Sequence, residues 1–153
     1  MKRGPIGKMR MKLLRWMVST FPLNAVRVSA LRSCGFKVGE EVYIGPGLIL
    51  STMNSDDSCM LTLGDRVSIG PGVTLVLASD ANHSRLSKIF PEVRGSITLK
   101  DDVWLGAGVI ILPNVTIGKC SAAAAGAVVT ENVDEFSLVG GVPAKVIRNL
   151  KLS

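Results

Sequence analysis

The sequence predicts an all-β parallel β-helix built from hexapeptides, preceded by a helical segment. The first observation behind this is a strict period of six that runs without a slip from residue 99 to residue 134. The first position of each hexad is aliphatic: Leu99, Leu105, Ile111, Ile117, Ala123 and Val129. The fifth position is small or β-branched: Val103, Val109, Val115, Ser121, Ala127 and Val133. Helices repeat apolar residues at spacings of three and four and strands alternate, so a period of six indicates a hexapeptide β-helix.

Composition is the second observation, because a narrow coil needs a core of small aliphatic side chains. The chain is 47% hydrophobic but only 5% aromatic, and it has 16 glycines. Each hexad supplies one short strand and one corner, and three hexads close a triangular coil. Turns with positive φ are expected between the apolar positions, at Gly106, Gly108, Asn114, Gly118 and Gly126.

The first part of the chain, residues 1–36, is a basic helical segment of a different kind. Residues 8–20 mix Lys and Arg with Met, Leu and Trp in the pattern of an amphipathic helix. A second helix is expected over residues 23–34, ending before Gly35. The apolar run is too short to span a bilayer. We favour a lid over the open end of the β-helix, and a membrane-surface helix through residues 8–20 is the alternative.

The β-helix itself is expected over residues 37–139, beginning at Val38, with loops at residues 51–60 and 81–96 where the period is interrupted. Leu63 and Leu99 begin the same repeat and stand 36 residues apart. This is twice the eighteen residues of a three-hexad coil, so the coil phase is kept across the second loop. About four coils follow from the hexads. The two loops are where adaptable surface, and therefore function, is expected.

The second loop holds the one histidine of the chain, His83. A lone histidine is often a polar surface residue, but this one stands where a protruding loop meets a rigid coil. Imidazole takes up a proton near neutral pH, so His83 is a candidate catalytic base, and Asp80 or Asn82 is a candidate to orient its ring.

Charge and cysteine content limit the partners. The net charge is +6, which favours an anionic partner, but no aromatic-interleaved basic patch or helix-turn-helix pattern points to nucleic acid. The three widely spaced cysteines and single histidine predict no metal site and reduced thiols. A cytoplasmic location is expected, with a peripheral position at the inner face of the membrane as the variant that a membrane-surface helix would imply.

Three segments in this order give the chain a resemblance to a known family. They are LGDRVSIGPGVTL (63–75), followed by the His83 loop, ITLKDDVWLGAGVIILPNVTIGKCSAAAAGAVVTENV (97–133), and GGVPAKVIR (140–148). Over residues 38–148 the chain resembles the hexapeptide-repeat acyltransferases, in the group of galactoside and maltose O-acetyltransferases and polysaccharide-locus acetyltransferases. The resemblance implies a left-handed β-helix, a homotrimer with acetyl-CoA in the clefts between subunits, and a C-terminal extension on the CoA side, residues 140–153.

The resemblance also implies roles for individual residues. His83 matches the general base that takes the acceptor's proton during direct transfer in a ternary complex. The backbone N–H of Ala107 matches the group that stabilises the thioester oxygen, although some relatives have Ser there. Matches to the acetyl-CoA site are Trp104 as a cleft wall, Gly106 and Ala107 beside the thioester, Ala125 along the pantetheine arm with Thr130 after it, and Lys145 and Arg148 near the phosphates. Trp104 also suits a trimer interface, and Glu131 replaces a Lys found in some relatives.

The acceptor is the open part of this hypothesis. Asn54, Asp56 and Asp57 in the first loop, with Asn82, are candidates for binding sugar hydroxyls, and a saccharide or glycan intermediate is the favoured acceptor. N-acetylation of an amino sugar or antibiotic is the alternative within the same chemistry. A non-catalytic β-helix assembly module and a zinc-dependent hydratase are alternatives of another class, and the single histidine argues against the hydratase.

Overall fold

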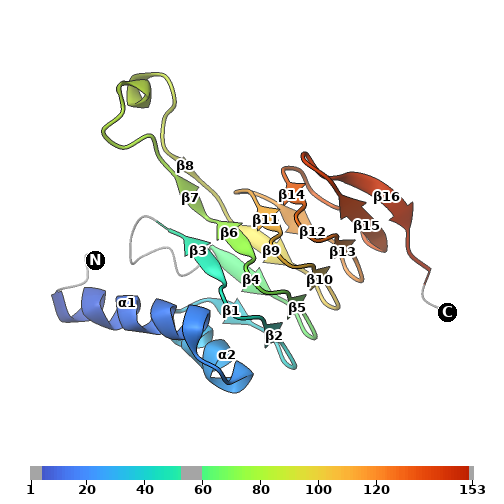
Figure 1. The fold of residues 1–153 in the computed structure, drawn as a ribbon, viewed down its shortest axis with the longest axis horizontal. Coiled ribbons are helices and arrows are strands. Elements are labelled where there is room, and N and C mark those ends of the chain that lie inside the picture. The colour runs from blue at the N-terminus through green and yellow to red at the C-terminus, as the bar shows by residue number, and fades with distance from the viewer. Residues whose placement is uncertain (1–4, 53–59, 152–153) are drawn as a thin grey trace.

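The computed structural model describes residues 5–52 and 60–151, and it has three mainly parallel sheets wound into a prism with two helices at its N-terminal end (Figure 1). We name the sheets by the order in which the chain enters them. Sheet A contains β1 (Lys37–Val38), β4 (Leu61–Leu63), β9 (Ile97–Leu99) and β12 (Thr116–Ile117). Sheet B contains β2 (Tyr43–Ile44), β5 (Ser68–Ile69), β10 (Trp104–Leu105), β13 (Ala122–Ala123), β15 (Ser137–Gly140) and β16 (Lys145–Asn149). Sheet C contains β3 (Ile49–Ser51), β6 (Thr74–Val76), β11 (Ile110–Ile111) and β14 (Val128–Val129).

Each hexad forms one side of a three-sided coil, as the sequence predicts. Every first- and fifth-position side chain between residues 99 and 134 is at most 7% exposed. Leu63 pairs in register with Val38 on one side and Leu99 on the other, so the coil phase is kept across the second loop. Four coils with a strand in each sheet are present in the described residues, and β15 adds part of a further turn. Because each coil pairs with its neighbours, the prism exposes strand edges only at its two ends.

Glycines at the corners are needed for two reasons, a positive φ or close stacking of coils. The sequence predicts only the first reason. Positive φ falls at the fourth hexad position, and the prediction is correct for Gly108, Asn114 and Gly126. It is wrong for Gly106 and Gly118, which are absent from the positive-φ residues. A Cβ on Gly106 would lie 2.6 Å from the backbone nitrogen of Ala125 in the next coil. Gly106 is therefore required by the close stacking of coils.

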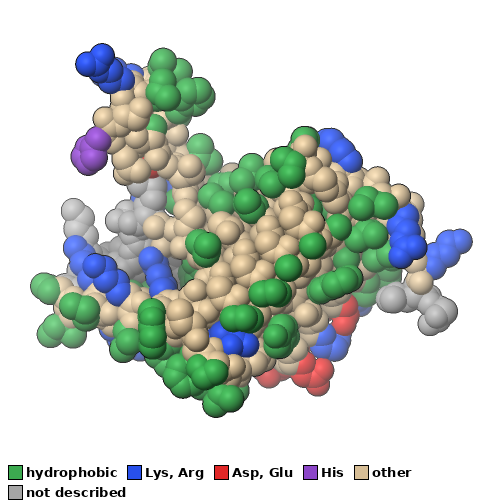
Figure 2. Space-filling view, in the orientation of Figure 1, with side chains coloured by type: hydrophobic (Ala, Val, Ile, Leu, Met, Phe, Trp, Pro, Cys, Tyr) green, Lys and Arg blue, Asp and Glu red, His purple; other side chains and the backbone are tan. Residues whose placement is uncertain are grey.

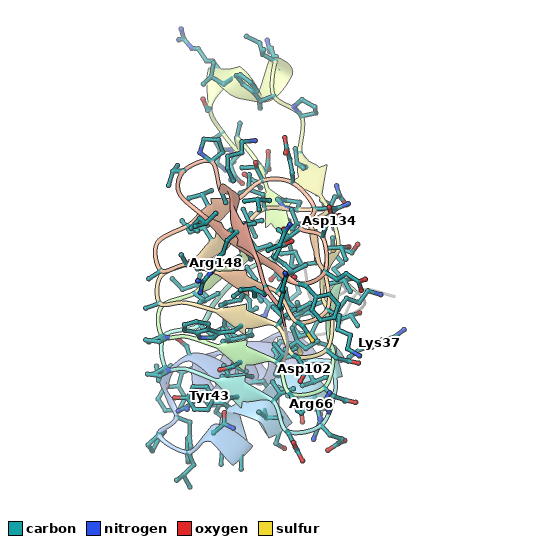
Figure 3. The ribbon with its side chains drawn as sticks, turned by 90° about the vertical axis from the view of Figure 1, so that its right-hand side faces the viewer. Lys37, Tyr43, Arg66, Asp102, Asp134 and Arg148 are labelled. Carbon is teal, nitrogen blue, oxygen red and sulfur yellow. The ribbon has the colours of Figure 1, made fainter. Side chains whose placement is uncertain are left out.

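The corner between sheets A and B, which we call the charged corner, is closed by side chains of successive coils. Asp65 Oδ1 accepts a hydrogen bond from the Glu40 N–H at 2.8 Å, and Asp101 Oδ1 accepts one from the Asp65 N–H at 2.9 Å. Arg66 pairs with Asp102 in a two-pronged contact, with Nε–Oδ1 2.6 Å and Nη2–Oδ2 2.9 Å (Figure 3). The hydrogen bond from Arg66 holds the pKa of Asp102 below its usual value, and the pKa of Arg66 is correspondingly raised. These contacts tie each coil to the next.

The open N-terminal edge of the prism is covered by α2 (Asn24–Ser33). Asn24 takes the place of a neighbouring strand on β2, because its Nδ2 donates to Val42 O at 3.0 Å and its Oδ1 accepts from Ile44 N at 2.9 Å. The guanidinium of the buried Arg27 donates to Ile44 O at 2.7 Å. These side chains satisfy backbone groups that a missing coil would otherwise bind.

The first helix, α1 (Pro5–Thr20), forms a second layer on α2. Its buried side chains are Met11 and Val18, and Ser19 O accepts a hydrogen bond from Gly47 N at 2.7 Å. The opposite side of α1 faces away from the protein. No helix in residues 5–52 or 60–151 is long and apolar enough to cross a bilayer.

Two features outside the regular coils complete the fold. β7 (Ala78–Ser79) pairs antiparallel with β8 (Val93–Arg94), and this stem carries a loop with the short 3₁₀ helix η2 (Arg85–Lys88) away from the prism (Figure 1). We call residues 80–92 the projecting loop. At the other end of the prism, β16 folds back antiparallel on β15.

Candidate functional site

The corner between sheets B and C has no large polar side chains, and we call it the alanine corner. Its third hexad positions, stacked from coil to coil, are Pro46, Pro71, Ala107 and Ala125. The two prolines have no N–H to donate. Ala107 and Ala125 are exposed, so any N–H that the stack leaves free there is open to a ligand.

The N–H groups on both sides of Ala107 are bonded within the stack, and the Ala107 N–H is not. The Gly106 N–H donates to Ala123 O at 2.9 Å, and the Gly108 N–H donates to Pro71 O at 2.9 Å. Among the described residues, the Ala107 N–H has no backbone or side-chain acceptor. The donor is held by a rigid turn, as an oxyanion-binding group must be.

Ala125 repeats this arrangement one coil further on. The Ala124 N–H donates to Val139 O at 2.8 Å and the Gly126 N–H donates to Ala107 O at 2.8 Å. No acceptor for the Ala125 N–H lies in the part of the chain that the structure describes. Adjacent coils are about 4.8 Å apart, so two unpaired donors stand in a row along one edge of the prism.

Trp104 stands on the outer face of sheet B beside this corner. It lies on β10 between Ser68 of β5 and Ala122 of β13 in register. Its neighbours on the sheet are small, and 59% of the Trp104 surface is exposed. Tyr43 occupies the same row on β2 and is also exposed. The ring suits both roles expected of it, a cleft wall and an interface contact.

The hairpin of β15 and β16 brings the expected basic residues to the C-terminal end of the same side. Ala144 N donates to Val128 O at 2.8 Å, so the hairpin turn is anchored to β14. Lys145 Nζ lies 3.6 Å from Glu131 Oε2, directly after the exposed Thr130. Both partners are exposed, so this ion pair is weak and easily exchanged for another anion.

Arg148 lies on the outer face of sheet B and pairs across the hairpin with Leu138. Figure 3, which looks along the prism from its C-terminal end, shows Arg148 and Tyr43 on one side and Lys37 on the other. Arg148 is exposed. It therefore shares a face with Trp104, at the end of the prism where Lys145 also lies.

The candidate base lies apart from this group. His83 is exposed on the projecting loop, where Figure 2 shows the one histidine of the chain standing away from the prism. Asp80 and Asn82 bond to each other: Asp80 Oδ1 accepts from the Asn82 N–H and Asp80 O accepts from Asn82 Nδ2, each at 3.0 Å. No hydrogen bond from either to the His83 ring is present among the described residues.

A polar hollow of about 380 Å³ opens at the base of the projecting loop. It is lined by Ser51, Thr52, Ala78, Ser79, Asp80 and Asn82. Sequence reasoning selected Asn82 for the acceptor site but missed Ser51, Thr52 and Ser79, because nothing in their local pattern separates them from ordinary strand-end residues. Asn54, Asp56 and Asp57 lie outside the described residues.

Within one chain, the base and the free amides lie at different corners. The projecting loop leaves the prism after β6 of sheet C and returns to β9 of sheet A. The alanine corner joins sheets B and C. No cluster of His, Cys, Asp and Glu suited to a metal ion is present in residues 5–52 and 60–151.

Comparison with known proteins gives a consistent result. No family model matches the chain. A 2,3,4,5-tetrahydropyridine-2,6-dicarboxylate N-acetyltransferase of Staphylococcus aureus is 43% identical over 60 residues, which are 39% of this chain and 25% of that protein. The chain spans about a quarter of the length of the curated relatives it matches first, which are 25–28% covered.

Solved structures match over nearly the whole chain. A hexapeptide-repeat-containing acetyltransferase of Vibrio cholerae superposes with a TM-score of 0.72 at 26% identity, covering 96% of this chain and 92% of that one. A galactoside acetyltransferase in complex with coenzyme A superposes with a TM-score of 0.68 at 27% identity, covering 96% and 82%. The chain therefore has the left-handed parallel β-helix fold of the hexapeptide-repeat acetyltransferases, and it is similar to them in sequence.

Proposed function

We propose that this protein is an acetyl-CoA-dependent O-acetyltransferase that acts on a hydroxyl of a saccharide or glycan intermediate. The observation that carries the proposal is the pair of unpaired N–H groups at Ala107 and Ala125, held by rigid turns beside the exposed Trp104. The similar galactoside acetyltransferase holds coenzyme A. A thioester and its pantetheine arm carry oxygen acceptors for such a row of donors.

In the proposed reaction, His83 removes the proton from the acceptor hydroxyl as its oxygen attacks the thioester carbonyl carbon. The carbonyl oxygen becomes negatively charged in the tetrahedral intermediate, and the Ala107 N–H donates a hydrogen bond to it. The carbon–sulfur bond then breaks, and the coenzyme A thiolate takes up the proton that His83 received. A positioned base typically contributes ~10²–10⁴ in rate, and one oxyanion donor ~10²–10³.

A homotrimer with its active sites between subunits is part of the proposal. His83 and Ala107 of one chain lie at different corners, so a site that needs both calls for the loop of one subunit and the alanine corner of its neighbour. Trp104 and Tyr43 on sheet B and Ile49 on sheet C are exposed apolar side chains on the faces that flank this corner. Subunit contacts would cover part of this surface.

The basic residues of the C-terminal hairpin supply the proposed contacts to the coenzyme A phosphates. Lys145 has only the exposed Glu131 as a partner of opposite charge within 4 Å among the described residues, at 3.6 Å. A phosphate group carries more charge than a carboxylate and would compete for Lys145. Arg148 would add a second cation on the same hairpin.

The polar hollow beside the projecting loop is the proposed acceptor site. Hydroxyl, amide and carboxylate side chains of Ser51, Ser79, Asp80 and Asn82 surround it, and such groups suit sugar hydroxyls. An amine acceptor is the second candidate, because the similar Staphylococcus aureus protein is an N-acetyltransferase. The acetyl transfer itself would be the same in both cases.

The decisive experiment measures thiol release from acetyl-CoA against matched sets of sugars and amino sugars, free and nucleotide-linked, after a thermal-shift measurement with acetyl-CoA alone. Stabilisation by acetyl-CoA and turnover with a hydroxyl acceptor are expected. Turnover only with amines would replace the acceptor class. Absence of any stabilisation by acetyl-CoA would overturn the proposal and favour a non-catalytic assembly module.

A further inference from the structure

We infer that the outer face of α1 binds an anionic lipid surface and holds the protein at a membrane. This surface, which we call the α1 outer face, consists of Ile6, Met9, Leu13 and Trp16. It is independent of the proposed acetyl transfer, because none of its residues belongs to the candidate site.

The α1 outer face is a continuous apolar stripe. Ile6, Met9, Leu13 and Trp16 recur at spacings of three and four, so they lie on one side of the helix. They are 86%, 70%, 56% and 57% exposed. The buried side chains Met11 and Val18 lie on the other side of the helix. Within residues 5–52 and 60–151 the exposed stripe therefore has no partner, and α1 packs on the protein through its other side.

The helix does not need this stripe to cover the prism. α2 makes the direct contacts to the first coil, through Asn24 and Arg27 on β2. α1 reaches the coil through the Ser19–Gly47 backbone bond. An amphipathic helix whose apolar face is turned outward, over a core that is already capped, is suited to a second binding partner.

The charge beside the stripe indicates what that partner is. Lys8 and Lys12 flank the stripe on one side and Arg10 flanks it on the other, by the rotation of an α-helix, and all three are exposed. The helix has no acidic residue. Figure 2 shows basic and hydrophobic side chains gathered together over α1.

Apolar side chains enter the acyl boundary of a bilayer while flanking lysines and arginines reach anionic headgroups. A second copy of this chain would present the same positive charge, so binding between two such faces would be opposed by repulsion. Charge complementarity therefore favours anionic lipid. Trp16, near the C-terminal end of the stripe, has the amphipathic ring that is enriched at membrane interfaces.

The test is co-sedimentation of the full chain with vesicles of one-third phosphatidylglycerol and two-thirds phosphatidylcholine, against vesicles of phosphatidylcholine alone. Binding is expected to the anionic vesicles and to weaken as NaCl rises from about 0.05 to about 0.5 M. Lys8→Gln/Lys12→Gln should weaken binding by roughly fivefold per lysine. The matched double variant Lys37→Gln/Lys100→Gln removes the same charge from exposed positions on the prism and should bind nearly as the wild type does.

The apolar contribution has its own variants. Leu13→Ser/Trp16→Ser should reduce binding by at least about tenfold, since it removes the two largest anchors. Both side chains are more than half exposed, so circular dichroism and the melting temperature should be unchanged. In Trp104→Phe, Trp16 is the one remaining tryptophan, and its emission should shift to the blue and be quenched by brominated lipid when anionic vesicles are added.

Three results would overturn the inference. One is equal binding to both vesicle types, and another is no binding to either. The third is Trp16 emission that is already blue-shifted without lipid, together with a mass above that of the Leu13→Ser/Trp16→Ser variant in light scattering. That result would show that the α1 outer face is buried between copies of the chain.

Discussion

The charged corner and the alanine corner occupy the same positions of successive hexads. They differ in the partners that their side chains provide for the backbone N–H groups. At the charged corner, the third-position N–H groups of Glu40 and Asp65 are bonded by the carboxylate of the next coil. At the alanine corner, the third position is proline in the first two coils. In the next two it is alanine, whose N–H has no acceptor within the described residues.

A free amide alone does not distinguish the two corners. The N–H groups of Asp101 and Lys119, at the same hexad position of the charged corner, also have no acceptor in the part of the chain that is described. The carboxylates of Asp101 and Asp102 stand beside them and would repel a developing negative charge. The geometry of the repeat leaves these N–H groups unpaired, and the charge of the neighbouring side chains determines whether an anion can bind to them.

The largest effect is expected from replacing His83, because the alanine corner itself contains no base. His83→Ala should lower kcat by ~10²–10⁴ with little change in the KM for acetyl-CoA, because His83 acts on the acceptor. Steady-state kinetics with an identified acceptor measure this. Lys88→Gln, on the same exposed loop, is the matched control and should keep the wild-type rate. Near-normal turnover in His83→Ala would remove His83 from the mechanism.

The next effect tests the alanine corner directly. Ala107→Pro deletes one N–H at a position where the two preceding coils already have Gly-Pro, at residues 45–46 and 70–71. The fold should therefore tolerate the change, while kcat falls by ~10²–10³ through loss of an oxyanion donor. Ala107→Ser keeps the N–H and should keep most of the rate. An unchanged kcat in Ala107→Pro, with an unchanged melting temperature, would contradict the assignment.

The same two variants test whether the site is shared between subunits. Purified His83→Ala and Ala107→Pro proteins should each be nearly inactive, but random exchange of subunits creates interfaces with one intact loop and one intact corner. Recovery to roughly a quarter of the wild-type rate is expected for a closed trimer. No recovery, after native mass spectrometry has verified exchange, would place both residues of a site in one chain.

The third effect falls on the stacking of coils. Gly106→Ala places a Cβ against the Ala125 backbone nitrogen at 2.6 Å, so the unfolding free energy should fall by about 1–3 kcal/mol. Gly108→Ala has open space but a φ of +67°, which costs about 1–2 kcal/mol. Urea unfolding measures both. In Gly106→Ala, kcat should also fall, since the Ala125 turn must move. No loss of stability would contradict the stacking argument.

The coils were predictable from the sequence because each hexad obeys local rules. Burial at the first and fifth positions follows from the period alone, and the register of Leu63 with Leu99 follows from counting residues. The antiparallel stem of β7 and β8 was not predictable, because residues 81–96 have no periodic pattern. The close approach at Gly106 was also missed. It depends on Ala125 in the neighbouring coil, which a local pattern does not contain.

The candidate site likewise has one part that the sequence predicts and another part that it does not. Trp104 and Ala107 lie on regular coil positions, so their placement beside each other follows from the hexads once the prism is closed. The polar hollow joins Ser51 to Asp80 from two different interruptions of the repeat, and no spacing rule connects them. The engagement of Asn82 with Asp80 was likewise missed, because an Asx turn requires knowledge of the local backbone.

The smallest effect comes from the charged corner and should leave catalysis untouched. Asp102→Asn removes the charge that pairs with Arg66, and asparagine suits the φ of 60° at this position. The hydrogen bond from Arg66 holds the pKa of Asp102 below its ordinary value, so the folded state binds the proton less readily than the unfolded state. The pair's contribution to stability is therefore complete above the ordinary aspartate pKa of about 3.9 and is lost as the pH falls through the lowered pKa of the folded state.

Asp102→Asn should have a slightly lower melting temperature than the wild type at pH 7. The gap between the two melting temperatures should close in acid and shrink in high salt, because the pair is exposed. A gap that persisted at low pH would show that Asp102 stabilises the corner by packing and not by charge, and a fall in kcat would show that the two corners are coupled.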